Sequence, residues 1–251
     1  MNLLLFAAEE LRANILTLED HRAEHIVRVL DLQQGDRLRL GMIDGPRGHG
    51  TILSISPAAV RLQVTLDDHV PVRPRLDLIL ALPRPIMLKR IFKQATVLGV
   101  DHIHLINSRR VEKSFFKASI LKPEKYRPLL IEGLSQAMDT ALPKISVHPL
   151  FKPFIEEVVP SWNTHHRLIA HPGDQQHQKT GGWPEIHGED KVVLAVGPEG
   201  GWIDYELRRF AEQGFRTFSL GPRILHVDTA VIALLARIEL LRELGPTLFP
   251  A

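Results

Sequence analysis

The sequence predicts an α/β protein in two parts, a small β-barrel in residues 1–73 and a larger domain with a parallel sheet in residues 74–251. Short strands separated by turn residues fill the first part. In the second part, continuous apolar strands alternate with helices, which is typical of a parallel sheet covered on both faces. The 251 residues, of which 44% are hydrophobic, suffice for two cores.

The N-terminal part is expected to begin with a strand in residues 1–10, which contain no basic residue and end in two acids. Such a segment is neither a signal peptide nor a membrane span, and it favours a cytoplasmic protein. Gly35 is expected to mark the turn that ends a first helix. That helix is predicted over His21–Leu30, and its apolar face consists of Ile26, Val29 and Leu30.

A β-hairpin is predicted next, with strands at Leu38–Leu40 and Thr51–Ile55 on either side of the glycine-rich turn Asp44–Gly50. Val60–Leu66 alternates apolar and polar residues with the period of a half-buried strand. A linker is expected to follow, because four residues typical of irregular segments lie close together: Asp67, Asp68, Pro71 and Pro74.

The second part is expected to alternate strands and helices. The predicted strands are Leu76–Leu82, His102–Ile106, Lys144–Pro149, Arg167–Ala170, Val192–Val196 and Phe215–Leu220. The predicted helices are Ile86–Leu98, Tyr126–Met138, Asp204–Gln213 and Thr229–Leu244, the last nearly all apolar and stopped by Gly245-Pro246. Ligands of parallel sheets bind beyond the carboxyl ends of strands, so the loops after Ala170, Val196 and Leu220 are predicted to form the site.

Two of these loops carry glycines where a strand turns into a helix. In Gly197–Trp202, the glycines allow a close backbone approach to a ligand, and Asp204 is expected to cap the following helix. The loop lacks the spacing of a Walker or dinucleotide motif, so phosphate binding is disfavoured. Ser219–Ala230 forms the second loop, in which Asp228 and Thr229 also suit helix capping. Together the two loops could wall an uncharged, adenosine-sized pocket.

Positive charge is concentrated in residues 75–127, which hold 12 Lys and Arg against 4 Asp and Glu. Such clustering suits a polyanion such as RNA, although a solvated basic helix face is an equally good reading. The predicted RNA-binding residues are Arg109, Arg110, Lys113, Phe115 and Lys117. Phe115 or Phe116 would stack on bases, unless they are core residues of a loop.

Several kinds of chemistry are disfavoured. The chain has no cysteine, which excludes disulfides, thiolate catalysis and cysteine-based metal sites. Its 13 histidines, including His165, His166, His171, His177 and His187, show no ligand spacing, so no metal is expected. The stretch Gly173–Gly188 is interpreted as a mobile surface loop.

The two glycine loops resemble the signature of a known family. Gly197-Pro198-Glu199-Gly200-Gly201, followed by Leu220–Ala230, resembles the RsmE family of bacterial ribosomal RNA small-subunit methyltransferases, which methylate N3 of one uridine in 16S rRNA. The resemblance extends to His21–Asp36, to Lys93–Val100 and to Ser108-Arg109-Arg110. This chain departs from the family at His226-Val227, where Arg-Thr is common, and at Val97, where Glu is usual.

The resemblance implies a fold, a cofactor and partners. It implies a PUA-like β-barrel for RNA binding followed by a SPOUT methyltransferase domain with a deep trefoil knot, and a homodimer formed through the knotted domain. It implies S-adenosylmethionine as cofactor and 16S rRNA in the small ribosomal subunit as partner, with no membrane and no metal. The implied cofactor-binding residues are Ala170, His171, Val196, Gly197, Pro198, Glu199, Gly200, Gly201, Leu220, Gly221, Pro222, Ile224, Leu225, His226, Thr229 and Ala230.

Two side chains are candidates for the chemistry. Removing the N3 proton of uridine calls for a carboxylate base or a cation that stabilises the anion, and Glu199 and Arg223 suit these catalytic roles. Alternatively, Glu199 bonds to backbone inside its own loop and Arg223 forms a structural ion pair. Two other functions remain open: a SPOUT methyltransferase of another RNA site, and a non-catalytic RNA-binding or ribosome-assembly protein.

Overall fold

The computed structural model describes residues 2–172 and 184–248. The chain divides into two compact units, Met1–Arg73 with Ile131–Leu142, and Pro74–Leu130 with Pro143–Ala251. The predicted boundary after residue 73 therefore coincides with the end of one segment of the first unit. The return of residues 131–142 to that unit was not predicted, and the boundary at residue 130 falls inside a helix, α3 (Pro123–Ala137).

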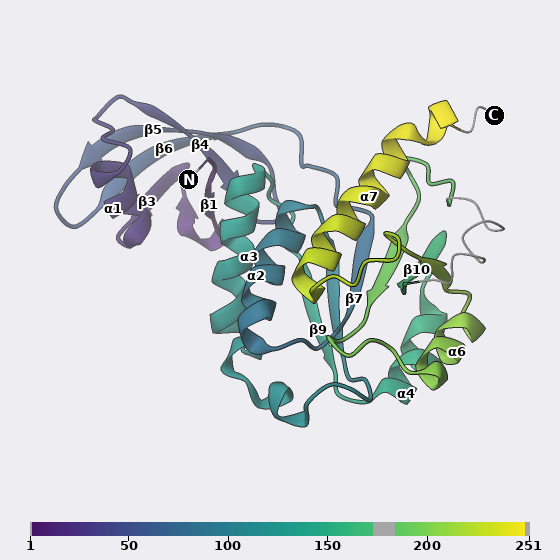
Figure 1. The fold of residues 1–251 in the computed structure, drawn as a ribbon. Coiled ribbons are helices and arrows are strands. Elements are labelled where there is room, and N and C mark those ends of the chain that lie inside the picture. The colour runs from purple at the N-terminus through teal and green to yellow at the C-terminus, as the bar shows by residue number, and fades with distance from the viewer. Residues whose placement is uncertain (1, 173–183, 249–251) are drawn as a thin grey trace. The chain divides into compact units, whose positions relative to one another are not determined.

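The first unit is built on one mixed, six-stranded sheet in the order β1-β4-β5-β6-β3-β2 (Figure 1). β1 pairs with β4 in parallel, and the other neighbours are antiparallel. One face carries the core of this unit, formed by ten buried apolar side chains: Leu4, Phe6, Leu16, Leu18, Ile26, Leu40, Ile52, Val60, Leu62 and Val64. The strands are β1 (Leu4–Phe6), β2 (Leu11–Arg12), β3 (Ile15–Leu18), β4 (Arg37–Met42), β5 (Arg47–Ile55) and β6 (Val60–Leu66).

The predicted hairpin is confirmed, because β4 and β5 pair with Leu40 opposite Gly48. Its turn is shorter than expected, since β5 already begins at Arg47. The hairpin of β2 and β3 was missed. Its two-residue turn, Ala13-Asn14, has φ of 48° and 63°. Alanine is uncommon at a turn position with positive φ, so the sequence did not indicate this turn.

Helix α1 (His21–Arg28) is shorter than predicted, and its proposed apolar face is partly wrong. Ile26 is fully buried, but Val29 is 66% exposed and Leu30 37% exposed, because the helix ends before them. Asp20 caps the helix by accepting a hydrogen bond from the backbone N–H of Arg22 at 2.9 Å.

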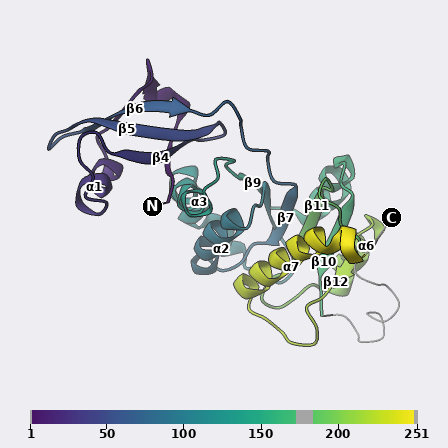
Figure 2. The ribbon, with the colours of Figure 1, turned by 90° about the horizontal axis from the view of Figure 1, so that it is seen from above.

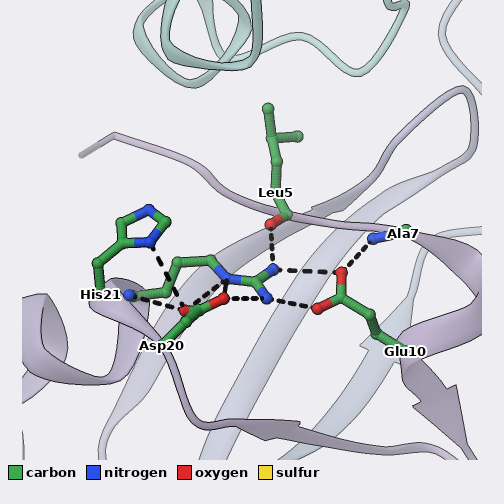
Figure 3. Close-up of polar contacts among 6 residues, drawn as sticks. Leu5, Ala7, Glu10, Asp20 and His21 are labelled. Carbon is green, nitrogen blue, oxygen red and sulfur yellow. Dashed lines mark hydrogen bonds and ion pairs between the residues drawn. The ribbon is translucent and has the colours of Figure 1, made fainter. Parts of the chain in front are cut away.

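The side chain of Arg22 joins three segments of the first unit, and Figure 3 labels its partners Leu5, Glu10 and Asp20. Its guanidinium donates to Asp20, to Glu10 and, at 3.0 Å, to the carbonyl oxygen of Leu5. Burial opposes ionisation of Glu10, but the bonds from Arg22 and from the Ala7 N–H outweigh it and lower the pKa of Glu10. The hydrogen bond from Arg22 likewise lowers the pKa of Asp20. The network ties the start of α1 to β1.

The second unit contains a six-stranded sheet, parallel throughout, in the order β12-β10-β11-β7-β8-β9. It confirms the predicted parallel sheet and all six predicted strands of this part of the chain. The central strands β11 and β7 are buried along their whole length. The strands are β7 (Leu76–Ala81), β8 (His102–Ile106), β9 (Lys144–His148), β10 (His166–Ala170), β11 (Val192–Val196) and β12 (Arg216–Phe218).

Helices α2 (Pro85–Val97) and α7 (Val227–Leu248) pack side by side on one face of this sheet (Figures 1 and 2). Two further helices in the described part of this unit are α4 (Phe151–Pro153), which continues as a π turn and a short 3₁₀ turn to Ser161, and α6 (Asp204–Glu212). Short 3₁₀ helices also occur at Ala8–Glu10, Lys113–Lys117 and Ser119–Leu121.

Two predicted helix signals in this unit are wrong. Helix α7 continues through Gly245-Pro246 instead of stopping there. Gly245 serves close packing, since a Cβ atom at this position would lie 2.5 Å from the carbonyl oxygen of Ile186. Asp204 does not cap α6, because the cap position is Ile203, whose N–H donates to the Glu206 carboxylate at 3.0 Å.

A histidine cluster fills the interior beside β8 and β9. His102 and His104 stack with ring centroids 3.8 Å apart, and His104 also lies 4.6 Å from the Trp162 ring. Nδ1 of His104 is 3.3 Å from Nε2 of His148, and Nε2 of His102 is 2.8 Å from the Ser146 hydroxyl. Burial lowers the pKa of His102 to about 4 and that of His104 to about 2. These rings are therefore neutral at neutral pH.

Candidate functional site

A pocket of about 340 Å³ opens where β10, β11 and β12 end. These are the carboxyl ends of parallel strands, where the sequence predicted the site. The volume is within the usual range for small-molecule sites. Its walls are Arg110, Ala170, His171, Pro172, Val196, Gly197, Pro198, Glu199, Gly200, Gly201, Trp202, Phe218, Ser219, Leu220, Gly221, Arg223, Ile224, Leu225, Val227, Ala230 and Leu234.

The pocket brings together most of the residues that the sequence assigned to the cofactor. Pro222, His226 and Thr229 are the three assigned residues that do not line it. Among the wall residues that were not assigned, Trp202, Phe218, Val227 and Leu234 contribute apolar surface, and Arg110 contributes charge. Backbone of the two glycine loops and apolar side chains therefore make up most of the wall, as expected for an uncharged ligand group.

The first glycine loop is a tight turn whose shape requires glycine at one position. The N–H of Gly201 donates to the carbonyl of Pro198 at 2.8 Å, and Gly201 has a φ of 74°, a left-handed conformation that costs other residues free energy. Trp202 follows and is 6% exposed. Its ring centroid lies 5.1 Å from that of Phe210 on α6, so the loop rests on a buried aromatic pair.

Glu199 points out of this loop toward helix α2. It is exposed, and its Oε1 accepts a hydrogen bond from the backbone N–H of Arg84 at 3.3 Å. Arg84 is the residue just before α2, where N–H groups lack partners within the helix. The alternative in which Glu199 bonds inside its own loop is therefore wrong for this structure.

The second glycine loop is held at its start by side chains. The Ser219 hydroxyl accepts from the N–H of Gly221 at 3.1 Å, and Arg237 on α7 donates to the Ser219 carbonyl at 2.9 Å. Arg223 lies at the pocket, is exposed, and forms no ion pair with any described residue. Nothing in the described part of the chain supports a structural ion-pair role for Arg223.

One buried carboxylate joins the end of the first glycine loop to the basic segment 109–117. It was not predicted from the sequence. Glu206 on α6 is 2% exposed. Its Oε1 accepts from the N–H of Arg109 at 2.7 Å and its Oε2 from the N–H of Ile203 at 3.0 Å. Next to it, the Arg110 guanidinium donates to the carbonyl of Gly200. A glutamate on the buried face of an amphipathic helix was the signal that could have revealed this link.

The predicted RNA-binding residues lie on the second unit with their cations in solvent. Arg109, Arg110, Lys113 and Lys117 are exposed, whereas Phe115 and Phe116 are both half-buried. Arg110 also lines the pocket, so the basic segment reaches the candidate cofactor site. The phenylalanines thus belong partly to the loop core, and the assignment of RNA binding stays a prediction.

Metal, membrane and loop predictions concern other parts of the chain. Among the described residues, no group of three or more His, Asp or Glu side chains is arranged to hold a metal ion. No helix within residues 2–172 and 184–248 is long and apolar enough to cross a membrane. Most of the stretch Gly173–Gly188, which was expected to be a mobile loop, including His177, lies outside the described residues.

Comparisons with known proteins agree with this architecture. The family described as "RNA methyltransferase domain" matches residues 71–239, so this part of the chain is an RNA methyltransferase domain. Over 239 residues, the chain is 33% identical to ribosomal RNA small subunit methyltransferase E of Treponema pallidum, covering 93% of this chain and 88% of that protein. The chain belongs to the ribosomal RNA small subunit methyltransferase E family.

Solved structures show the same fold. A probable rRNA-methyltransferase from Porphyromonas gingivalis is 26% identical, with a TM-score of 0.75 and coverage of 95% of this chain and 98% of that one. A ribosomal RNA small subunit methyltransferase E from Neisseria gonorrhoeae, bound to S-adenosyl methionine, is 20% identical, with a TM-score of 0.76 and coverage of 96% and 98%. The similarity extends over both units.

Proposed function

We propose that this protein transfers a methyl group from S-adenosylmethionine to N3 of a uridine in 16S rRNA of the small ribosomal subunit. The observation that carries the proposal is the pocket at the ends of β10, β11 and β12, whose walls are the two glycine loops of the family signature. The names of the relatives support ribosomal RNA as the substrate.

The residues of the pocket fit S-adenosylmethionine. Backbone groups of Gly197–Gly201 and of Leu220–Leu225 would hold its polar edges, and the side chains of Trp202, Phe218 and Leu234 would cover its apolar surface. When bound, this cofactor supplies an electrophilic methyl group and leaves as a neutral thioether. The protein must hold the uridine in line with that group, exclude water and manage the N3 proton.

Glu199 and Arg223 are our candidates for the proton chemistry. Both lie at the pocket and are exposed, and the N–H of Arg84 fixes the direction of Glu199. Glu199 would accept the N3 proton, and Arg223 would stabilise the uridine anion. We expect Glu199→Gln or Arg223→Ala to lower single-turnover methylation about 100-fold or more, with cofactor binding kept. Unchanged single-turnover rates would remove the residue from the chemistry.

The family also supports finer features that we include in the proposal. The first unit would be a PUA-like RNA-binding domain, and the C-terminal segment of the second unit would form a trefoil knot around the cofactor. The protein would act in the cytoplasm as a homodimer through the second unit. Sedimentation of the purified protein tests the dimer directly, since a monomer at micromolar concentration would contradict it.

The central experiment incubates the protein with labelled S-adenosylmethionine and small ribosomal subunits from a strain without this activity. We expect 3-methyluridine in the digested 16S rRNA, identified by mass. If another nucleoside carries the label, the assignment of the fold stands and the assignment of the substrate is wrong. Absence of cofactor binding would contradict the methyltransferase function itself and favour a non-catalytic RNA-binding protein.

A further inference from the structure

The mouth of the pocket is bordered by arginines from more than one segment of the second unit. Arg110, from the loop after β8, and Arg223, from the second glycine loop, line the pocket. Arg84 lies beside it at the start of α2, where its N–H donates to Glu199 at 3.3 Å. A side-chain contact with Gly200 holds Arg110, and the backbone contact with Glu199 holds the chain at Arg84.

A fourth arginine lies further along α2. Nη1 of Arg90 is 3.2 Å from Oδ2 of Asp228, which lies in the first turn of α7, where the second glycine loop enters this helix. The Arg90 side chain is 68% exposed, whereas that of Asp228 is only 14% exposed. The cation of this pair therefore remains open to solvent, while its carboxylate is largely covered.

The charge around the mouth is positive. Arg84, just before α2, and Lys89 and Arg90, in the first half of α2, are all exposed. The carboxylates in contact with this group are Glu199, which the Arg84 N–H engages, and Asp228, which Arg90 engages. Cations thus outnumber carboxylates on this side of the pocket, which favours a polyanion over a neutral partner.

We propose, on the basis of the proposed function, that Arg84 and Arg90 bind phosphates of the RNA nucleotides next to the target uridine. A base inside an RNA strand reaches a pocket only when its nucleotide is turned out of the strand. The neighbouring phosphates then stay at the mouth of the pocket, and guanidinium groups bind phosphate with two parallel hydrogen bonds. These two arginines lie outside the segment 109–117, which contains all the RNA-binding residues predicted from the sequence.

The test measures binding of the full-length protein to unmodified 16S rRNA as a function of salt. Each phosphate contact to a single strand contributes about 0.7 to the slope of log K against log salt concentration. We expect Arg84→Ala/Arg90→Ala to weaken binding about tenfold near 0.1 M salt and to reduce the slope by about 1.4. The affinity for S-adenosylmethionine should not change. Arg84→Lys/Arg90→Lys should retain most of the slope.

Arg216→Ala is the matched control. Arg216 is an exposed arginine of the same unit at the amino end of β12, and it does not line the pocket. We expect less than a twofold change in RNA affinity and the wild-type slope. An equal loss in this variant would mean that total charge, rather than the position of Arg84 and Arg90, determines binding, and would overturn the proposal.

Asp228→Asn separates phosphate binding from a purely structural ion pair. If Arg90 only anchors α7 through Asp228, removing either partner should impair RNA binding equally. If Arg90 binds phosphate, the asparagine variant should bind RNA at least as tightly as the wild type, while Arg90→Ala binds more weakly. A protein that binds RNA in this way but methylates nothing would overturn the proposed function alone. An unchanged slope in the double variant would overturn this inference alone.

Discussion

At the scale of single residues, substitution of Glu206 has the clearest expected effect on the stability of the fold. Glu206→Gln keeps the shape of the side chain, but an amide nitrogen cannot accept, so the backbone N–H of either Arg109 or Ile203 loses its acceptor on this buried side chain. Such a loss costs about 1–3 kcal/mol. Differential scanning calorimetry should show a melting temperature lowered by about 2–4 °C per kcal/mol for a chain of this size.

The same substitution should weaken cofactor binding, because both N–H groups belong to segments at the pocket. Glu212→Gln is the control: this exposed glutamate of the same helix pairs with Arg209 at the surface, and such pairs contribute about 0–1 kcal/mol. Equal affinities of both variants for S-adenosylmethionine in titration calorimetry would show that Glu206 does not shape the pocket.

Arg22 gives a second prediction, which includes a dependence on pH. Because the pKa values of Glu10 and Asp20 are lowered in the folded state, their contribution to stability is present above the unfolded value of about 4 and is lost as the pH falls through the folded values. Arg22→Ala should cost about 1–2 kcal/mol near pH 7 and much less near pH 3.

Urea unfolding at both pH values measures this difference. Arg28→Ala provides the comparison, since Arg28 and Glu24 form a pair whose side chains are 75% and 57% exposed. We expect its effect to stay below about 0.5 kcal/mol at either pH. A cost of Arg22→Ala that is the same at pH 3 and pH 7 would contradict the carboxylate network as its cause.

At the scale of elements, apolar runs and the alternation of apolar and polar residues were the reliable signals in the sequence. β8, β11 and β6 match the predicted ranges residue for residue. The failures occurred where an element is specified by an unusual turn or by tertiary packing. The turn Ala13-Asn14 lacks glycine, and Gly245 marks a close approach to Ile186 rather than a helix end. Neither cause is visible in the local sequence.

The candidate site was predictable to the extent that it consists of contiguous loops. Gly197–Gly201 and Leu220–Leu225 could be placed at strand ends from the order of elements alone. The positions of Arg84, Arg110 and Glu206 could not be predicted, because their contacts join residues 90 or more positions apart in the sequence. Arg84 and Arg110 contact the first glycine loop, and Glu206 contacts Arg109 in the basic segment. Such contacts depend on how the sheet assembles.

The histidines of β8 and β9 predict a loss of stability in mild acid. Their folded pKa values lie below the unfolded value of about 6.5. The unfolded state therefore binds more protons below pH 6.5, and the free energy of unfolding decreases as the pH falls. A neutral, buried His104 alone contributes about 1.4 kcal/mol per pH unit between pH 6 and pH 5.

His104→Phe tests this dependence, since phenylalanine fills the aromatic site without titrating. We expect the slope of unfolding free energy against pH, measured between pH 5.0 and 6.5, to decrease by about one proton. Identical slopes for wild type and His104→Phe would contradict the neutral state of His104.

At the scale of the whole molecule, the two units cannot be separated by a cut after residue 73. The segment 131–142 belongs to the first unit, and Leu134, Thr140 and Ala141 are buried there. Ser135 donates to the carbonyl of Leu3 at 2.7 Å, and Thr140 donates to that of Gly45 at 2.6 Å. A fragment of residues 74–251 would leave this segment without its partners.

We expect that fragment to bind a hydrophobic dye and to melt at a lower temperature than the second unit within the full chain. Within it, Leu134→Ser/Ala141→Ser should reduce dye binding, because the exposed apolar side chains are removed. A fragment that melts cooperatively at the full-chain temperature without dye binding would contradict the assignment of residues 131–142 to the first unit.

The discontinuous first unit also has a consequence for synthesis on the ribosome. Residues 1–73 emerge first, yet the carbonyls of Leu3 and Gly45 meet Ser135 and Thr140 only after 142 residues have been made. Closing such sequence-distant contacts slows folding, and an uncovered sheet is exposed to aggregation in the meantime. The nascent N-terminal sheet is therefore incompletely covered while residues 74–130 of the second unit are translated, and chaperones should engage this chain at that stage.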